Sequence, residues 1–372
     1  MRTMLVEPWG SRLGGAEAIL WLFLRHVDRE RIDPTVVFLD DGPWLEEVRS
    51  LNIETLLVDA GRLRQPLRYL RAVSAIERAI ADTASELVVS WAAKAHLYAG
   101  VAARRAGVRA AWWQQGIPAD RHWIDRLAAV VPTELIACYC GDAEASQQAI
   151  HPRRPTRVIH PGIELSEPVV PILRTHLGIP PERFVVGIVG RLQPWKGQHL
   201  VIEAVAQLNQ RGIDAHGLVV GGDAYGLSPQ YAASLPALAR RLGIDDRVTF
   251  TGHVPDALPY YGATDVAVNA SRAEPFGMVV LEAMAQGVAI VAADAAGPRE
   301  IIEPGVSGLL FADGGLVEKL VDLARNPDRR AALARGGRER VKLFAAPAMA
   351  RTIERAFFDA RGCPGDSASR SA

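Results

Sequence analysis

The chain contains 372 residues, of which 49% are hydrophobic, and its 42 basic residues balance its 42 acidic residues. Because ordinary domains hold roughly 100 to 200 residues, this length predicts two domains, each with enough apolar residues for its own core. A balanced charge is not typical of proteins that bind nucleic acids through the phosphates. We therefore expect two globular domains and no nucleic-acid partner.

The sequence has no pattern typical of a targeting or membrane-spanning segment. Met1–Val6 reads as a short apolar strand rather than a signal peptide, and uncharged runs stay below the about 18 residues of a membrane helix. The three cysteines are Cys138, Cys140 and Cys363, and the C-x-C spacing of the first two differs from the C-x-x-C of zinc and redox sites. We expect a cytoplasmic protein with buried thiols and no metal site.

Short apolar runs alternate with helical patterns in the first half, which is typical of a parallel α/β domain. The predicted strands are Thr3–Val6, Thr35–Leu39, Thr55–Val58, Leu87–Ser90, Ala110–Trp113 and Leu135–Cys138. Helices are predicted over Ala16–Val27 and Pro66–Ala81. Three prolines and a glycine between His160 and Pro171 predict a domain boundary, so the first domain is expected over residues 1–165.

The second half, residues 166–345, repeats the same alternation. The predicted strands are Phe184–Val189, Gly217–Val220, Val248–Thr251, Val266–Asn269 and Ala289–Ala292. Helix Leu200–Leu208 follows the first of them. The fold class is therefore α/β, with two Rossmann-like, doubly wound parallel-sheet domains that face a central cleft, where ligands meet the carboxyl ends of the strands. Residues 366–372 are small and polar, and we expect a disordered tail.

The most informative segment runs from Ser271 to Ala285. It follows the strand that ends near Asn269, and it predicts a helix that begins around Phe276 or Gly277. N–H groups at the start of a helix are unpaired and lie at the positive end of its dipole, so they favour a diphosphate. Glycine lets the backbone approach such a ligand closely.

Two glutamates frame this segment. Glu274 precedes the predicted helix, and Glu282 lies between one and two turns inside it. At 1.5 Å rise per residue, an offset of eight residues spans up to about 12 Å. That length can place one carboxylate beside a sugar and the other beside a ribose, with a diphosphate between them.

The stretch from Glu274-Pro-Phe-Gly to Glu282 resembles the signature of family 4 of the GT-B glycosyltransferases. Further motifs of that family have counterparts in the family order over nearly the whole chain. They are Gly14–Glu17, His160–Glu164, Gly190–Gly197, Val219–Asp223, Thr251–Asp256 and Gly297–Ile301. Each match is weak alone, and the family rests on their order.

The resemblance implies a retaining transfer of a sugar from a UDP- or GDP-sugar to a hydroxyl acceptor, without a metal or other cofactor. It also implies that a helix near residues 346–362 packs back on the first domain. In this family the phosphate oxygen of the donor is thought to take the acceptor proton. The protein then contributes positioning and charge stabilisation instead of a nucleophile.

A physical argument, as well as the resemblance to the family, assigns Arg191 and Lys196 a role in stabilising the leaving diphosphate. A leaving nucleotide diphosphate develops negative charge, and two cations fixed at a strand–loop–helix corner stabilise it, as a divalent metal does elsewhere. The alternative is that both are ordinary surface charges. With Glu274, which by resemblance contacts hydroxyls of the transferred sugar, they form the predicted catalytic set.

The resemblance assigns the remaining donor contacts. Glu282 is implied to accept hydrogen bonds from the ribose hydroxyls, and Val254 to line the base pocket. Gly15 is implied to approach the donor phosphate from the first domain. The backbone amides that are implied to meet the sugar and diphosphate belong to Phe276, Gly277, Met278 and Val279.

The acceptor side departs from the family pattern. Many relatives carry a histidine near the cleft of the first domain, and where they read His-Gly this chain reads Gln115-Gly116. Glutamine cannot take a proton. The candidates for acceptor contacts are therefore Gly14, His96 and Gln115, and the alternative for His96 is an ordinary helix residue.

Two other kinds of function remain open alternatives, and a third is disfavoured. A GT-B epimerase or phosphorylase would share the fold, and a non-catalytic nucleotide-sugar-binding protein would share the motifs. An NAD-dependent oxidoreductase is disfavoured, because no Gly-x-Gly-x-x-Gly follows a strand with an acidic residue about twenty positions later.

The identity of the acceptor is open. Arg62–Arg71 is basic and partly amphipathic, and Arg104, Arg105 and Arg109 add positive charge to the same domain. One hypothesis is peripheral contact with anionic lipid at the inner face of the membrane, serving a lipid-linked or polysaccharide acceptor. The alternatives are a solvated arginine-rich face and a soluble acceptor such as a natural product.

Overall fold

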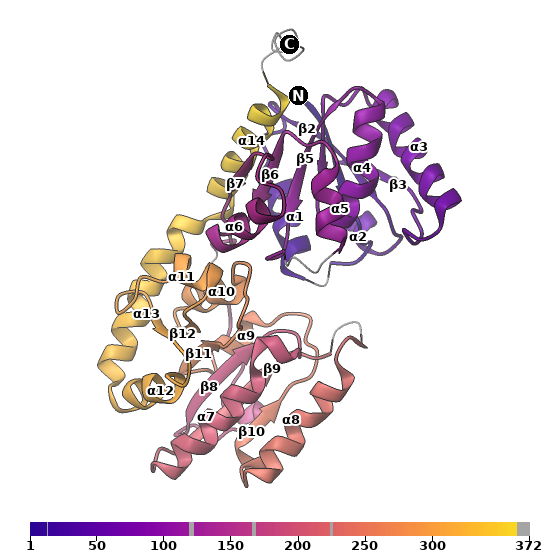
Figure 1. Ribbon diagram of the computed structural model, residues 1–372. Coiled ribbons are helices and arrows are strands. Elements are labelled where there is room, and N and C mark those ends of the chain that lie inside the picture. The colour runs from indigo at the N-terminus through magenta and orange to yellow at the C-terminus, as the bar shows by residue number, and fades with distance from the viewer. Residues whose placement is uncertain (13, 119–122, 166–168, 224–225, 363–372) are drawn as a thin grey trace. The chain divides into compact units, whose positions relative to one another are not determined.

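The computed structural model describes residues 1–12, 14–118, 123–165, 169–223 and 226–362. The chain divides into two compact units (Figure 1). The first unit comprises Met1–Gly162 and the segment from Ala346 onward, and the second comprises Ile163–Ala345. Each unit is built on one parallel sheet, so the expected doubly wound α/β fold is confirmed.

The sheet of the first unit has seven strands in the order β3-β2-β1-β4-β5-β6-β7, and all pairings between neighbouring strands are parallel. β1 and β4 are fully or almost fully buried beyond their first residue, as expected for strands that helices cover on both faces. The strands are β1 (Arg2–Glu7), β2 (Asp33–Phe38), β3 (Glu54–Leu57), β4 (Leu87–Ser90), β5 (Arg109–Gln114), β6 (Leu135–Cys138) and β7 (Thr156–Val158).

The helices of this unit cover both faces of its sheet. β5 shows this directly: Trp112 stacks on His96 of α4, whereas its neighbour Trp113 meets Phe357 of α14 edge to face at 6.0 Å between ring centroids. Neighbouring strand residues point to opposite faces. The helices are α1 (Gly15–His26), α2 (Trp44–Arg49), α3 (Pro66–Asp82), α4 (Ala93–Arg105), α5 (Trp123–Val130), α6 (Gly141–Ile150) and α14 (Ala346–Arg361).

The last helix, α14, belongs to the first unit although the chain of the second unit precedes it. It packs against α1 and β5, and Phe357 meets Phe23 of α1 at 5.4 Å between ring centroids. The buried carboxylate of Glu354 accepts a hydrogen bond from the backbone N–H of Asp28 (2.9 Å) and pairs with Arg31 (3.2 Å). An apolar face and an ion pair between the half-exposed Arg31 and the buried Glu354 together fix this helix.

The second unit has a six-stranded parallel sheet in the order β10-β9-β8-β11-β12-β13. Its strands are β8 (Phe184–Val189), β9 (Ala215–Val220), β10 (Val248–Phe250), β11 (Val266–Asn269), β12 (Ala289–Ala293) and β13 (Leu309–Phe311). Its α-helices are α7 (Gln198–Gln210), α8 (Pro229–Arg241), α9 (Leu258–Tyr261), α10 (Met278–Ala285), α11 (Ala296–Ile301), α12 (Leu316–Arg325) and α13 (Pro327–Val341). Short 3₁₀ turns are η1 (Arg174–Leu177), η2 (Pro194–Lys196), η4 (Asp245–Arg247) and η5 (Lys342–Phe344).

All eleven strands expected from the sequence are present. Two three-residue strands, β7 and β13, were not expected. The helix after β8 begins at Gln198, two residues earlier than predicted, and the helix after β11 begins at Met278. The earlier start of α7 is consequential, because it brings Gln198 and His199 into the first helical turn.

The cysteines, the C-terminal tail and the absence of a membrane-spanning helix were also predicted from the sequence. Cys138 and Cys140 are buried, and burial raises the pKa of Cys138 to about 12, so its thiol stays protonated. Cys363 and the predicted tail, 366–372, lie outside the described residues. Within the described ranges, no helix has the length and apolar character needed to cross a bilayer.

Candidate functional site

The loop from Gly190 to Gly197 joins β8 to α7 and has a backbone shape that requires glycine at its end. Gly197 has φ of +79°, and a Cβ atom there would lie 2.6 Å from the carbonyl oxygen of Ala270. Three backbone hydrogen bonds tie the loop to neighbouring strand ends. Gly190 N–H donates to Val220 O (2.9 Å) and Leu192 N–H to Gly222 O (3.0 Å), while Arg272 N–H donates to Trp195 O (3.0 Å). The loop is therefore held against two other strand ends of its sheet.

Lys196 stands at the end of this loop and meets Glu274. Its Nζ atom lies 2.5 Å from Glu274 Oε2, and the two side chains are only 15% and 10% exposed. The ammonium group also lies 4.2 Å from the ring centroid of Trp195, within the range of a cation–π contact. Because water is largely excluded, these charges act more strongly on each other and on a nearby ligand than exposed charges would.

The segment from Glu274 to Gly277 packs against the start of α11. Gly297 N–H donates to Glu274 O (3.2 Å), and a Cβ atom on Gly297 would lie 2.2 Å from Phe276 Cα. Gly277, with φ of +106°, is the N-cap residue of α10, and the helix proper begins at Met278 and Val279. These glycines let the backbone turn sharply into the helix start.

Glu282 lies in the second turn of α10. The hydroxyl of Tyr261 donates to its Oε2 atom (3.0 Å). Burial raises the pKa of Glu282 above its usual range, the Tyr261 hydrogen bond opposes this shift, and Asp256 reinforces it. Lys196 lowers the same pKa, so this glutamate and the Lys196–Glu274 pair act within one electrostatic neighbourhood.

Arg191 and Val254 complete the predicted residues of the second unit. Arg191 is half-buried, and its carbonyl oxygen accepts a hydrogen bond from Gln198 Nε2 (2.9 Å). Among the described residues, no acidic side chain lies within ion-pair distance of its guanidinium. Val254 is half-buried and packs against the buried apolar cluster that includes Val220 and Leu218. The structure thus places Arg191 and Lys196 on one loop, while Val254 stands on the loop after β10.

Gly14 and Gly15 lie at the start of α1 in the first unit. Gly14 is the N-cap residue, and a Cβ atom there would lie 2.5 Å from Glu17 Oε2. Gly15 is exposed. A side chain at Gly14 would therefore displace the end of the Glu17 side chain.

His96 does not reach the surface. It is 0% exposed, its ring stacks on Trp112 at 5.4 Å between centroids, and Nδ1 lies 3.0 Å from Ser90 Oγ. Burial lowers its pKa to about 4, so the ring is neutral at pH 7. Gln115 is half-buried, and its Nε2 atom donates to Trp91 O (2.5 Å). The structure does not bring these two side chains together.

Two side chains that the sequence did not single out take part in these networks. The Tyr261 hydroxyl donates to Glu282. The Tyr231 hydroxyl donates to Oε1 of Gln198 (3.2 Å), the residue that follows the Gly190–Gly197 loop. Neither tyrosine belongs to a motif, and only a contact across the folded unit reveals them. Among the described residues, no three His, Cys, Asp or Glu side chains gather in a group that could hold a metal ion.

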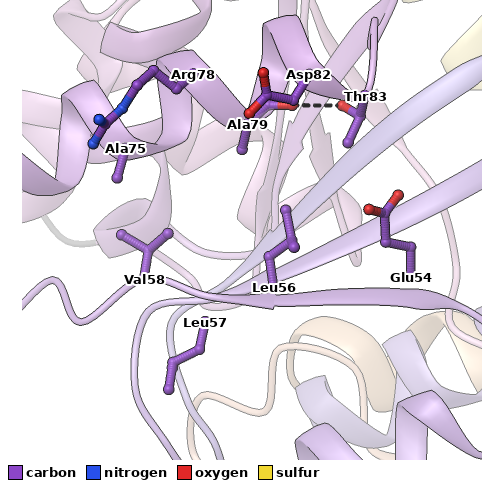
Figure 2. Close-up of a pocket in the computed structure, with 9 residues that line it drawn as sticks. All are labelled: Glu54, Leu56, Leu57, Val58, Ala75, Arg78, Ala79, Asp82 and Thr83. Atoms are coloured by element: carbon purple, nitrogen blue, oxygen red, sulfur yellow. Dashed lines mark hydrogen bonds between the residues drawn. The ribbon is translucent and has the colours of Figure 1, made fainter.

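A separate groove of about 500 Å³ lies in the first unit between β3 and α3 (Figure 2). Leu56 and Val58 point toward α3, where Ala75 and Ala79 face them, and Leu57 points to the other side of the strand. β3 is an edge strand of its sheet. None of the predicted site residues lines this groove.

Comparison with known proteins relates this chain to sugar-transferring enzymes. Residues 170–340 match the family model described as Glycosyl transferases group 1. The chain is 35% identical over 243 residues to the D-inositol 3-phosphate glycosyltransferase of Salinispora tropica. This match covers 59% of this chain and 48% of that protein. For the same enzyme of Kribbella flavida the identity is 30% over 220 residues, 57% of this chain and 50% of the relative. The chain spans about half the length of the curated relatives it matches.

Solved structures match over nearly the full chain. HepE of Anabaena, in complex with UDP-glucose, has a TM-score of 0.83 at 25% identity and covers 96% of this chain and 99% of its own. The sucrose-phosphate synthase of Thermosynechococcus elongatus has a TM-score of 0.77 at 21% identity, with 96% and 98% covered. At that lower identity the second match bears on the fold alone.

Proposed function

The chain has the GT-B fold, and its residues 170–340 form a glycosyl transferases group 1 domain; on this premise we propose that the protein is a glycosyltransferase. It moves a sugar from a nucleotide-diphosphate donor to a hydroxyl group of an acceptor. We further propose that it belongs to family 4, retains the anomeric configuration and needs no metal or other cofactor. The observation that carries the proposal is the Lys196–Glu274 pair beside a glycine-shaped loop and a helix start.

Charge and geometry in the second unit support a diphosphate-sugar ligand there. Lys196 and Arg191 supply positive charge from a single loop, and the first turn of α10 presents unpaired N–H groups from Met278 and Val279. In the mechanism that we propose, these groups stabilise the negative charge of the leaving diphosphate. No side chain attacks the sugar.

The two glutamates are proposed to orient the donor. Glu274, held by Lys196, accepts hydrogen bonds from hydroxyls of the transferred sugar. Glu282, held by Tyr261, accepts them from the ribose. Because both carboxylates are fixed by partners within the unit, little side-chain entropy is lost when the donor binds.

UDP is the first nucleotide to test. HepE, the Anabaena protein with the similar fold, binds UDP and UDP-glucose. The diphosphate and ribose contacts proposed above do not distinguish UDP from GDP, so GDP-sugars are the second class of donor. Val254 is proposed to contact the base, and Gly15 of the first unit is proposed to contact a donor phosphate.

The acceptor is proposed to be a hydroxylated small molecule or a growing glycan. The relatives that act on D-inositol 3-phosphate support a polyol phosphate as the first acceptor to test. Lipid-linked glycans, polysaccharides and natural products form the second group. On the acceptor side Gly14 and Gln115 are proposed contacts, whereas full burial disfavours direct contact by His96.

The direct test is an assay of transfer. The full chain is incubated with UDP- and GDP-sugars and a panel of acceptors, and the released nucleotide and the glycosylated product are measured together. Transfer with an axial or equatorial linkage that matches the donor supports a retaining glycosyltransferase. Interconversion of the donor without product would point to an epimerase, and binding without turnover to a non-catalytic protein.

Peripheral contact with anionic membranes is proposed for the segment Arg62–Arg71, which leads into the first turns of α3. Arg62, Arg64, Arg68 and Arg71 are exposed, and among the described residues none of them has an ion-pair partner. Leu67 and Leu70 on the same segment are 70% and 53% exposed. Apolar side chains flanked by unpaired arginines suit the interface of an anionic bilayer. Arg105, by contrast, pairs with Glu77 (2.9 Å).

Co-sedimentation with vesicles tests this contact. We expect binding to phosphatidylcholine vesicles that contain phosphatidylglycerol, and loss of binding in Arg64→Glu/Arg68→Glu. Arg335→Glu changes an exposed arginine of the second unit and serves as the control. Equal binding to neutral and anionic vesicles, or an equal loss in the control, would contradict the proposal.

A further inference from the structure

The first turn of α7 carries a buried hydrogen-bond network that reaches back into the Arg191 loop. Gln198 is 1% exposed, and its Nε2 atom donates to the carbonyl oxygen of Arg191 (2.9 Å). Its Oε1 atom accepts a hydrogen bond from the hydroxyl of Tyr231 (3.2 Å). Both ends of the Gln198 amide are thus engaged, so the side chain has a single favourable orientation.

Tyr231 stands on α8 and is saturated by this network. Besides donating to Gln198, its oxygen accepts the backbone N–H of His199 (3.3 Å) and lies 3.0 Å from His199 Nδ1. One donated and two accepted hydrogen bonds use the full capacity of a phenol, which assigns the proton of His199 to Nδ1. The backbone N–H of His199 lies in the first turn of α7, where no helical carbonyl is available to it.

The tyrosine also keeps its proton under ordinary conditions. Burial raises the pKa of Tyr231, while its contacts with His199 and Gln198 lower it by less. The ring of His199 meets that of Tyr231 edge to face, at 5.9 Å between centroids and 85° between planes. The Tyr231 hydroxyl therefore keeps the proton that it donates to Gln198 Oε1.

We propose that Tyr231 is a positioning residue for the Arg191–Gly197 loop, acting through Gln198 on the Arg191 carbonyl. The inference rests on the proposed function, in which this loop holds the donor diphosphate. The other anchors of the loop are the backbone hydrogen bonds that join Leu192 to Gly222 and Trp195 to Arg272, and the Lys196–Glu274 ion pair. The Tyr231–Gln198 connection adds an anchor at the carbonyl oxygen of Arg191, which none of those contacts engages.

The first measurement is binding of UDP or GDP to the full chain by calorimetry, with kcat and KM for the donor. Tyr231→Phe leaves the Gln198 amide oxygen and the His199 N–H without their partner, and we expect about tenfold weaker nucleotide binding. The matched control is Tyr260→Phe, because the Tyr260 hydroxyl has no hydrogen-bond partner among the described residues. The control should change affinity by less than about twofold.

A double-mutant cycle separates positioning from general destabilisation. If Tyr231 acts through Gln198, the penalty of Tyr231→Phe shrinks to about threefold or less in a Gln198→Ala background. An unchanged penalty in that background would overturn the proposal, and so would nucleotide affinity equal to wild type in Tyr231→Phe.

Hydrogen exchange gives a readout that does not depend on the proposed function. The amides of Leu192 and Lys196 bond to Gly222 and Gln193, and both should exchange faster in Tyr231→Phe than in Tyr260→Phe. If the wild type binds no nucleotide, the proposed function fails while this result still tests the network. Unchanged exchange at both amides would overturn the positioning role.

Discussion

The two units end their parallel sheets in different ways. In the second unit, side chains from the loops after β8 and β11 meet as a shielded pair, Lys196 with Glu274. In the first unit, the candidate histidine lies inside α4 and packs into the core against Trp112 of β5. The same architecture thus gives a charged site in one unit and an aromatic core contact in the other. Lys196 and Glu274 follow strand ends on loops, whereas His96 lies on the sheet-facing side of a helix, and this placement accounts for their different surroundings.

The largest effect that we expect at the charged site of the second unit is that of Lys196→Ala. The substitution removes a cation proposed to stabilise the leaving diphosphate and leaves the mostly buried Glu274 carboxylate without its partner. We expect kcat to fall by about 10²- to 10³-fold, the loss typical of a preorganised electrostatic contact. Steady-state kinetics with the donor measure it.

The control for that experiment is Lys342→Ala. Lys342 forms an exposed pair with Glu339 (2.6 Å) in the same unit, and such surface pairs contribute little. We expect kcat to stay within about twofold of wild type. Similar losses in both variants would show that Lys196 has no special role.

The second prediction concerns the histidine of the first unit. The folded pKa of His96 is about 4, below the 6.5 of an unperturbed histidine. The unfolded chain therefore binds more protons between these values, and stability is complete above pH 6.5 and is lost as the pH falls toward 4. At pH 5 this one group costs about 2 kcal/mol of unfolding free energy relative to pH 7.

Urea unfolding of wild type and His96→Gln at pH 5 and pH 7 checks this dependence. The variant should be less stable at pH 7 and should lose less stability between the two pH values. Donor affinity should be unchanged in the folded variant. If His96→Gln abolished sugar transfer with its stability intact, His96 would belong to the site and the contrast between the units would fail.

A smaller effect is expected at Glu282. Glu282→Gln keeps the shape of the side chain and removes its charge, and we expect about tenfold weaker donor binding, the size of a hydrogen bond to a charged group. Because burial raises the pKa of Glu282, donor binding should also begin to weaken at a higher pH than for an ordinary glutamate as the solution is acidified. Calorimetric titration across pH measures both.

Glu318→Gln is the matched control for that variant. Glu318 pairs with Arg211 (2.7 Å) and is 68% exposed, so its neutralisation should leave donor affinity unchanged. An effect at Glu318 as large as that at Glu282 would mean that net charge, and not a specific contact, sets the affinity.

No effect at all is expected from chelation. If Arg191 and Lys196 take the part that a divalent cation takes elsewhere, EDTA should leave kcat unchanged, and added Mg²⁺ or Mn²⁺ should alter it by less than about twofold. A transferase assay with and without chelator measures this. Complete loss of transferase activity with EDTA, restored by one metal ion, would contradict the proposed metal independence.

Most of the fold could be predicted from the sequence because buried parallel strands appear as continuous apolar runs. Phe184–Val189 and Leu87–Ser90 are of this kind, and both were found with their observed bounds. Thr156–Val158 and Leu309–Phe311 were missed, since three residues are too few to show a period. Their strand character comes from pairing with a neighbour at the sheet edge.

The site was predictable only where motifs carried it. Lys196 and Glu274 lie 78 positions apart, and their two motifs name both residues but not the ion pair between them. Tyr261 and Tyr231 belong to no motif, and their roles depend on which helix packs beside which loop. His96 is a case in which the sequence suggested a site residue and the structure buries it. The ring packs on Trp112 of the adjacent strand, and no local sequence pattern links the two residues.

The most direct test of the account is a thermal-shift titration of the full chain with UDP- and GDP-sugars, on wild type and Lys196→Ala. We predict a rise in Tm that is specific to one nucleotide, grows with donor concentration and shrinks in the variant. At a donor concentration of 100 times Kd the stabilisation amounts to about 2.7 kcal/mol. A folded wild type whose Tm is unchanged by every nucleotide sugar would contradict the claim that the second unit holds a donor site.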